Sequence, residues 1–190
     1  MPVVALLGDS YSKGIAASTN GKCSTTLVSA AMGWSELNLA EGGSGYTTSY
    51  LGQKTDYGIK LDVMPRQPDT AVVSGGRNDY EAGTPSVTGA VASSLFEATK
   101  AAAPSTQVIV TSPIWNSTEP PADFATQIDA ANHSAAHADT RYLDIGEPLA
   151  GRSNIGEPLA GRSNTIDSDG LYPNDAGRRA IAEAVVSVLE

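Results

Sequence analysis

The segment Val3-Val-Ala-Leu-Leu-Gly-Asp-Ser10 joins a short apolar run to the turn residues that end it. Its first part, Val3–Leu7, predicts a buried β-strand, because the run is short, aliphatic and bounded by turn residues. Runs of the same kind recur along the chain at Leu37–Ala40, Thr70–Ser74, Gln107–Thr111 and Arg141–Ile145. Turn residues follow each of them, and a helix-like stretch follows most of them.

Helix-like stretches are predicted at Thr25–Met32, Tyr57–Met64, Ser86–Ala103, Ala122–Ala138 and Asn174–Leu189. The third and the last show the clearest 3.6-residue spacing of apolar residues. Strands that alternate with helices indicate a parallel sheet. The sequence therefore predicts an α/β fold, a three-layer α/β/α sandwich around a central parallel five-stranded sheet. In such open sheets the ligand site lies beyond the carboxyl ends of the strands.

Composition limits the number of domains and the class of partner. The 190 residues with 41% hydrophobic content predict one domain over residues 1–190. The formal net charge of −9, with 12 scattered Lys and Arg residues, argues against nucleic acid or an anionic membrane as a partner. No window reaches the roughly 18 apolar residues that a membrane helix needs. Cys23 is the single cysteine, which excludes an internal disulfide.

The N-terminus leaves the compartment open. Met1–Leu7 has no basic residue and is too short for a signal peptide before the first predicted strand. We therefore expect a soluble chain, either intracellular or a secreted domain expressed without its signal peptide.

Residues 145–164 contain an exact tandem repeat. Ile145–Asn154 reads IGEPLAGRSN, and Ile155–Asn164 repeats it letter for letter. Two copies of ten residues are too few for a solenoid. We interpret the repeat as a recent or engineered duplication in a surface loop, where the entropic cost of added length grows only logarithmically.

Polar and glycine-rich segments follow three of the predicted strands. They are Gly8-Asp-Ser10, Gly42-Gly43-Ser-Gly45 and Gly75-Gly-Arg-Asn78-Asp79. A fourth segment, Asp169-Gly-Leu-Tyr172-Pro-Asn174, precedes the last predicted helix. Each segment alone is typical of a structural turn or a helix start. Because they occur together and in this order, we expect them to converge at the carboxyl edge of the sheet.

The order of these segments resembles that of the SGNH, or GDSL-like, hydrolases. That family carries Gly-Asp-Ser after the first strand, a glycine block, Gly-x-Asn-Asp and a late Asp-x-x-His-Pro block. The resemblance implies a flavodoxin-like fold and a serine ester hydrolase that needs no cofactor. It assigns the nucleophile to Ser10 and the oxyanion hole to the backbone N–H groups of Ser10 and Gly43 with the side-chain amide of Asn78. Asp169 takes the position of the acid that orients the catalytic base.

The residue in the position of the family's catalytic histidine is Tyr172. A serine nucleophile needs a neighbouring base, and a phenol is a poor base near neutral pH. Losing one member of a catalytic triad costs about three to six powers of ten in turnover. We therefore expect a carboxylic ester hydrolase, acting through an acyl-serine intermediate on acetylated carbohydrate, acyl glycerol or other small acyl esters, that is impaired by Tyr172. The alternative is a catalytically silent domain that binds a glycan or an acyl ligand in the same cleft.

Two other kinds of site receive less support from the sequence. His133 and His137 lie four residues apart in a predicted helix, and we expect them to be solvent-facing or boundary residues. They lack the Glu that follows the first His in the metalloprotease motif, so no metal site is predicted. The segment Gly8–Gly14 fits neither common phosphate-binding glycine pattern, which argues against a nucleotide binder.

Overall fold

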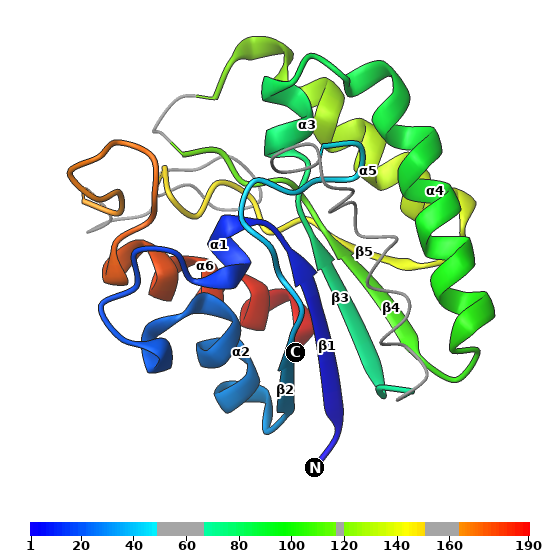
Figure 1. Ribbon diagram of the computed structural model, residues 1–190, viewed down its shortest axis with the longest axis horizontal. Helices are drawn as coiled ribbons and strands as arrows, with labels where there is room; N and C mark the ends of the chain where they lie inside the picture. Colours follow the sequence, from blue (N-terminus) through cyan, green and yellow to red (C-terminus); the bar gives the residue numbers. More distant parts are fainter. Residues whose placement is uncertain (49–66, 117–119, 151–163) are drawn as a thin grey trace.

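The computed structural model describes residues 1–48, 67–116, 120–150 and 164–190. At its centre lies a parallel five-stranded sheet in the order β2-β1-β3-β4-β5 (Figure 1). The strands are β1 (Val3–Gly8), β2 (Ser35–Asn38), β3 (Thr70–Ser74), β4 (Gln107–Thr111) and β5 (Arg141–Leu143). This arrangement confirms the predicted α/β fold with its central parallel sheet.

Two pairs of helices cover the two faces of the sheet (Figure 1). The pair α2 (Ser24–Met32) and α6 (Asp175–Leu189) packs on one face, and the pair α4 (Pro85–Ala102) and α5 (Ala125–His137) packs on the other. Short helical turns lie between the larger elements at α1 (Ser10–Lys13), η1 (Asn20–Lys22), α3 (Arg77–Glu81) and η4 (Ala122–Phe124).

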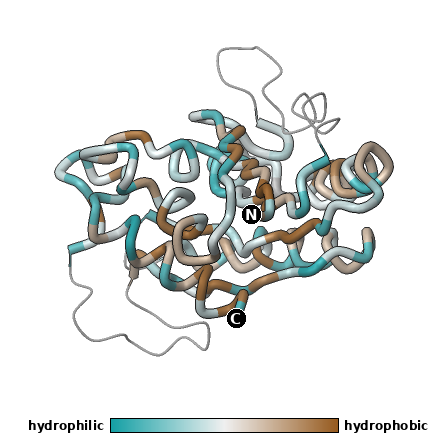
Figure 2. The backbone as a smooth tube through the Cα atoms, turned by 90° about the horizontal axis from the view of Figure 1, so that it is seen from below, coloured by the Kyte–Doolittle hydropathy of each residue, from teal (hydrophilic) through white to brown (hydrophobic). Residues whose placement is uncertain are grey.

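Alternation along the strands explains why both faces are apolar. In β1, the side chains of Ala5 and Leu7 join the core beneath α4 and α5, while those of Val4 and Leu6 join the core beneath α2 and α6. Successive residues of a strand point to opposite faces, so a continuous apolar run is what a sheet covered on both sides requires. Figure 2 shows the apolar segments toward the middle of the molecule and hydrophilic residues along many outer turns.

The second strand begins two residues earlier than predicted. Gly33 ends α2 in the left-handed conformation, with φ 66°, and the chain then turns directly into the sheet, where Ser35 pairs with Val3. The apolar run Leu37–Ala40 therefore covers only the end of β2. The last strand, β5, ends at Leu143 and not at the predicted Ile145. Directly after it, the side chain of Asp144 accepts a hydrogen bond from the backbone N–H of Gly146 and forms a turn.

The predicted helices are otherwise close to those observed. The stretch predicted as one helix from Ala122 is divided, with the 3₁₀ turn η4 before α5. The helix predicted at Tyr57–Met64 and most of the second repeat copy, Ile155–Asn164, lie outside the described residues. Within the described part of the chain, no helix is long and apolar enough to cross a membrane.

Candidate active site

Ser10 is the first residue of α1, directly beyond the carboxyl end of β1. Asp9 caps this helix, since its Oδ1 atom accepts a hydrogen bond of 2.9 Å from the backbone N–H of Tyr11. Gly14, with φ 81°, ends the helix after one turn. Burial raises the pKa of the Asp9 carboxyl, while the hydrogen bond from Tyr11 and the charge of Arg77 oppose that rise. The turn thus fixes Ser10, which is buried, at the strand end.

A glycine-rich loop passes beside Ser10. A Cβ atom built on Gly42 would lie 4.0 Å from the Cβ atom of Ser10, so the loop backbone approaches the serine closely. The next residue, Gly43, has φ 73°, a conformation that glycine adopts most readily. Asn78, in α3, donates a hydrogen bond of 2.8 Å from its Nδ2 atom to the carbonyl oxygen of Ser44. The structure therefore brings Ser10, the Gly43 loop and the Asn78 amide into one neighbourhood.

Asp79 anchors the same loop, a role that the sequence analysis missed. Its carboxylate is fully buried and accepts hydrogen bonds from the backbone N–H groups of Tyr46, Thr47 and Thr48, at 3.0, 2.7 and 3.2 Å. The hydroxyls of both threonines donate to it as well. A Cβ atom on Gly45 would lie 2.3 Å from the Asp79 carboxylate, so only glycine fits there.

Asp169 and Tyr172 lie in a separate loop that precedes α6. The Oδ1 atom of Asp169 accepts hydrogen bonds from the backbone N–H groups of Leu171 and Tyr172, at 2.8 and 3.1 Å, and these bonds lower the pKa of the carboxyl. Asp169 is exposed, whereas Tyr172 packs partly against the core beneath α2 and α6. Within the described part of the chain, no hydrogen bond joins the side chains of Ser10, Asp169 and Tyr172.

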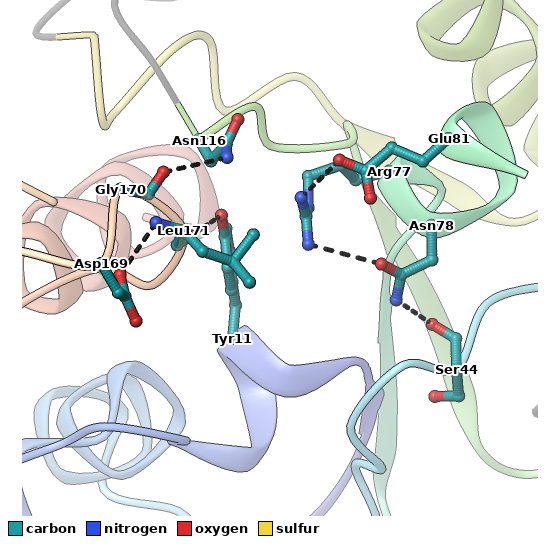
Figure 3. Close-up of polar contacts among 9 residues, drawn as sticks. All are labelled: Tyr11, Ser44, Arg77, Asn78, Glu81, Asn116, Asp169, Gly170 and Leu171. Carbon is teal, nitrogen blue, oxygen red and sulfur yellow. Dashed lines mark hydrogen bonds and ion pairs between the residues drawn. The ribbon is translucent and has the colours of Figure 1, made fainter. Parts of the chain in front are cut away.

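Side chains from the body of the protein hold the Asp169 loop. The Tyr11 hydroxyl donates a hydrogen bond of 2.7 Å to the carbonyl oxygen of Leu171, and the Asn116 amide donates one of 3.3 Å to that of Gly170 (Figure 3). Burial is the main cause that raises the pKa of Tyr11, which keeps its hydroxyl protonated as a donor. Tyr11 directly follows the proposed nucleophile in the sequence, so one turn of helix contacts both parts of the site.

The two histidines lie elsewhere. His133 and His137 are exposed on α5, where they line an open groove against α4. The Nδ1 atom of His137 lies 3.4 Å from a carboxylate oxygen of Glu97, and that of His133 lies 2.7 Å from the carbonyl oxygen of Asp129. Both are solvent-facing residues, as the sequence analysis expected. Among the residues that the structure describes, no group of three or more His, Cys, Asp or Glu side chains is arranged to hold a metal ion.

The chain is similar to known proteins in sequence and in fold. Residues 6–180 match the model of the GDSL-like lipase/acylhydrolase family. A GDSL lipase of Mycobacterium tuberculosis is 28% identical over an alignment of 203 positions. The alignment covers 98% of this chain and 80% of the lipase.

Solved structures of esterases share the fold. A psychrotrophic esterase from Pseudoalteromonas sp. superimposes with a TM-score of 0.73 at 14% identity, over 100% of this chain and 97% of the esterase. A family two carbohydrate esterase from Cellvibrio japonicus gives 0.76 at 14% identity, over 100% of this chain and 61% of that one. Because the family model spans nearly the whole chain, this protein belongs to the GDSL-like lipase/acylhydrolase family, whose members hydrolyse esters.

Proposed function

We propose that this chain hydrolyses carboxylic esters through an acyl-serine intermediate on Ser10. The observation that carries the proposal is that the glycine loop lies beside Ser10 at Gly42, while the Asn78 amide donates a hydrogen bond to Ser44 of the same loop. The Ser10 hydroxyl oxygen attacks the ester carbonyl while its proton passes to a base, and the base returns that proton to the leaving alcohol. Water then attacks the acyl-serine and releases the acid. The N–H groups of Ser10 and Gly43 and the Nδ2 atom of Asn78 stabilise the negative oxygen formed in both steps.

The base that removes the serine proton is the weak point of this site. Tyr172 occupies the position that the family gives to histidine, and a phenol is a poor proton acceptor near neutral pH. We infer that the chain forms and hydrolyses the acyl-serine slowly. The proposed oxyanion donors do not depend on the base, and in serine hydrolases the oxyanion hole together with substrate binding sustains a residual acceleration of about 10³ to 10⁴ over water.

Small acyl esters, including acetylated carbohydrates, are the proposed substrates. Support comes from the family itself and from the carbohydrate esterase whose fold this chain shares. A small ester suits a site in which Ser10 is only 4% exposed. The chain's net charge of −9 also favours a neutral substrate over a polyanionic one.

Placing a histidine at position 172 is the direct test of this proposal. Tyr172→His should raise the hydrolysis of a short-chain aryl ester at least about a hundredfold, the lower end of what general-base catalysis supplies. Ser10→Ala in the same background should abolish the gain. Intact mass after incubation with an organophosphonate should show one adduct on the unaltered protein, formed faster on the histidine variant and absent from Ser10→Ala.

The second candidate function is a catalytically silent domain that binds a glycan or an acyl ligand. Two observations favour it: Tyr172 itself, and the carboxylate of Asp169, which accepts hydrogen bonds from its own loop rather than from a base. A folded Tyr172→His variant that neither hydrolyses short acyl esters nor reacts with the phosphonate would support this candidate. Calorimetric titration with acetylated oligosaccharides would then look for binding that Asn78→Ala weakens.

A further inference from the structure

We propose that Arg77 is a positioning residue for both parts of the site. It fixes the orientation of the Asn78 amide, and it holds Tyr11, which in turn holds the Asp169 loop (Figure 3). The role of Arg77 in catalysis rests on the proposed ester hydrolysis, whereas its effect on the Asn78 amide does not.

Arg77 is a buried cation held at several points. Its side chain is only 5% exposed, and its Nη1 atom donates to a carboxylate oxygen of Glu81 at 2.8 Å. Its Nη2 atom lies 3.4 Å from the Oδ1 atom of Asn78. A buried charge requires partners, and the planar guanidinium can meet several of them in a fixed geometry. Glu81 is one helical turn beyond Arg77, so α3 itself sets the direction in which the guanidinium points.

The contacts of Asn78 select one orientation of its amide. An asparagine amide can rotate by half a turn, which exchanges its oxygen and nitrogen with little change in shape. In the orientation observed, Oδ1 faces the donors of Arg77 and Nδ2 faces the carbonyl oxygen of Ser44. After rotation, two donors would face each other on one side and two acceptors on the other. Arg77 thereby favours the state in which Nδ2 points toward the loop beside Ser10.

Tyr11 carries the influence of Arg77 to the second loop. The guanidinium carbon lies 5.2 Å from the centre of the Tyr11 ring, a distance at which a cation is attracted to an aromatic face. The hydroxyl of the same ring binds the carbonyl oxygen of Leu171, whose N–H group binds Asp169. A continuous series of contacts therefore runs from the Ser44 carbonyl through Asn78, Arg77 and Tyr11 to the Asp169 loop.

Steady-state kinetics in the Tyr172→His background test the catalytic role. Arg77→Met should lower kcat for a short-chain aryl ester by about tenfold or more, with KM changed less than about twofold, because an oxyanion donor acts mainly in the transition state. Arg141→Met is the matched control, since Arg141 lies at the amino end of β5, and should leave both constants unchanged. If Arg77→Met does not fold, Glu81→Gln removes the charge of the half-exposed partner of Arg77 while keeping an acceptor oxygen, and it should give a smaller fall in kcat with the same split.

Hydrogen exchange of the Asn78 side-chain amide, followed by ¹⁵N NMR, provides a readout that needs no activity. Arg77→Met, or Glu81→Gln in its place, should speed this exchange by about tenfold, and Arg141→Met should not. If the histidine variant is inert but the exchange responds, the proposed function fails and the effect of Arg77 on Asn78 stands. Unchanged exchange overturns the proposal whatever the activity. An active histidine variant whose kcat is insensitive to Arg77 overturns it as well.

Discussion

The glycine loop and the Asp169 loop, which together form the candidate site, are held in different ways. Asp79, a residue of α3, is fully buried and accepts backbone hydrogen bonds from residues of the glycine loop 31 to 33 positions away. Asp169 accepts them from residues only two and three positions away and is exposed. The first carboxylate joins distant parts of the chain, whereas the second forms a local turn.

Because of this difference, we expect substitutions in the two loops to have different effects. The glycine loop is part of the tertiary structure, because α3 holds it through Asp79 and Asn78. The Asp169 loop depends on the Tyr11 and Asn116 contacts for its position relative to Ser10. We therefore expect a substitution at Tyr172 to leave the glycine loop undisturbed. We expect a substitution of Asp79 to affect mainly the free energy of unfolding, and a substitution of Tyr172 to affect mainly the rate of the proposed ester hydrolysis.

The largest expected effect comes from removing the buried carboxylate. Asp79→Ala leaves three backbone N–H groups without their acceptor, and each unsatisfied buried donor is costly, so the free energy of unfolding should fall by about 3 kcal/mol or more. Asp169→Ala removes an exposed carboxylate and should cause a much smaller loss, because water can replace it as the acceptor. Urea denaturation of both variants measures the contrast. Equal losses would show that the two loops are anchored alike.

A smaller effect is expected from cutting the link between the two loops. Tyr11→Phe removes the hydrogen bond to Leu171 but keeps the ring beneath Arg77, so it should cost about 1 kcal/mol of unfolding free energy. Backbone hydrogen exchange should rise in residues 167–172 and stay constant in residues 42–48. A rise in both segments would contradict the separation of the two loops.

The end of the Asp169 loop should also respond to acid. Asp175, the first residue of α6, receives hydrogen bonds from Lys22 at 2.7 Å and from the hydroxyl and N–H groups of Ser18, and these hold the pKa of its carboxyl well below the ordinary 3.8. A carboxyl whose pKa is lower in the folded state than in the unfolded state stabilises the fold at any pH above its unfolded-state pKa. This stabilisation is lost as the pH falls toward the folded-state pKa. The Tm difference between the unaltered protein and Asp175→Asn should thus shrink between about pH 5 and about pH 2. A difference that stays constant over this range would contradict the assignment.

The sequence was sufficient for the centre of the sheet because β1, β3 and β4 are short, largely apolar runs buried on both faces, and the predicted and observed bounds of β3 are the same. The outer strands β2 and β5 carry exposed polar residues, and their bounds differ from the predicted ones. The order of the polar segments also predicted that Ser10, Gly43, Asn78 and Asp169 converge at one edge. In the structure Ser10 and Asn78 both lie beside the glycine loop, and the catalytic roles of the four residues stay predictions. The role of Asp79 could not be read from spacing, because its partners lie more than 30 residues away and Asn-Asp alone indicates a turn. The Asp within the Gly-x-Asn-Asp pattern was the available signal. The sequence carries no comparable signal for Arg77, because its burial depends on where Tyr11 and Glu81 lie in the folded chain.

The smallest effect is expected from shortening the chain before the Asp169 loop. The Thr165 hydroxyl donates a hydrogen bond of 2.5 Å to the carbonyl oxygen of Leu149, and both residues are buried, so the chain on either side of residues 150–164 is already joined. Deleting Ile155–Asn164 would reduce the separation of these partners from 16 residues to 6. Because the copies are identical, Asn154 would then precede Thr165 as Asn164 does now.

Closing a shorter loop costs less entropy, and the logarithmic dependence limits the gain to about 1 kcal/mol. The deletion variant should therefore fold with a Tm equal to that of the unaltered protein or a few degrees higher. Replacing Ile155–Asn164 by ten Gly and Ser residues keeps the length and should leave the Tm nearly unchanged, which separates loop length from the repeated sequence. An unfolded deletion variant, or a Tm lowered by both changes, would mean that the second copy packs against the fold and that this loop is anchored more like the one bound to Asp79.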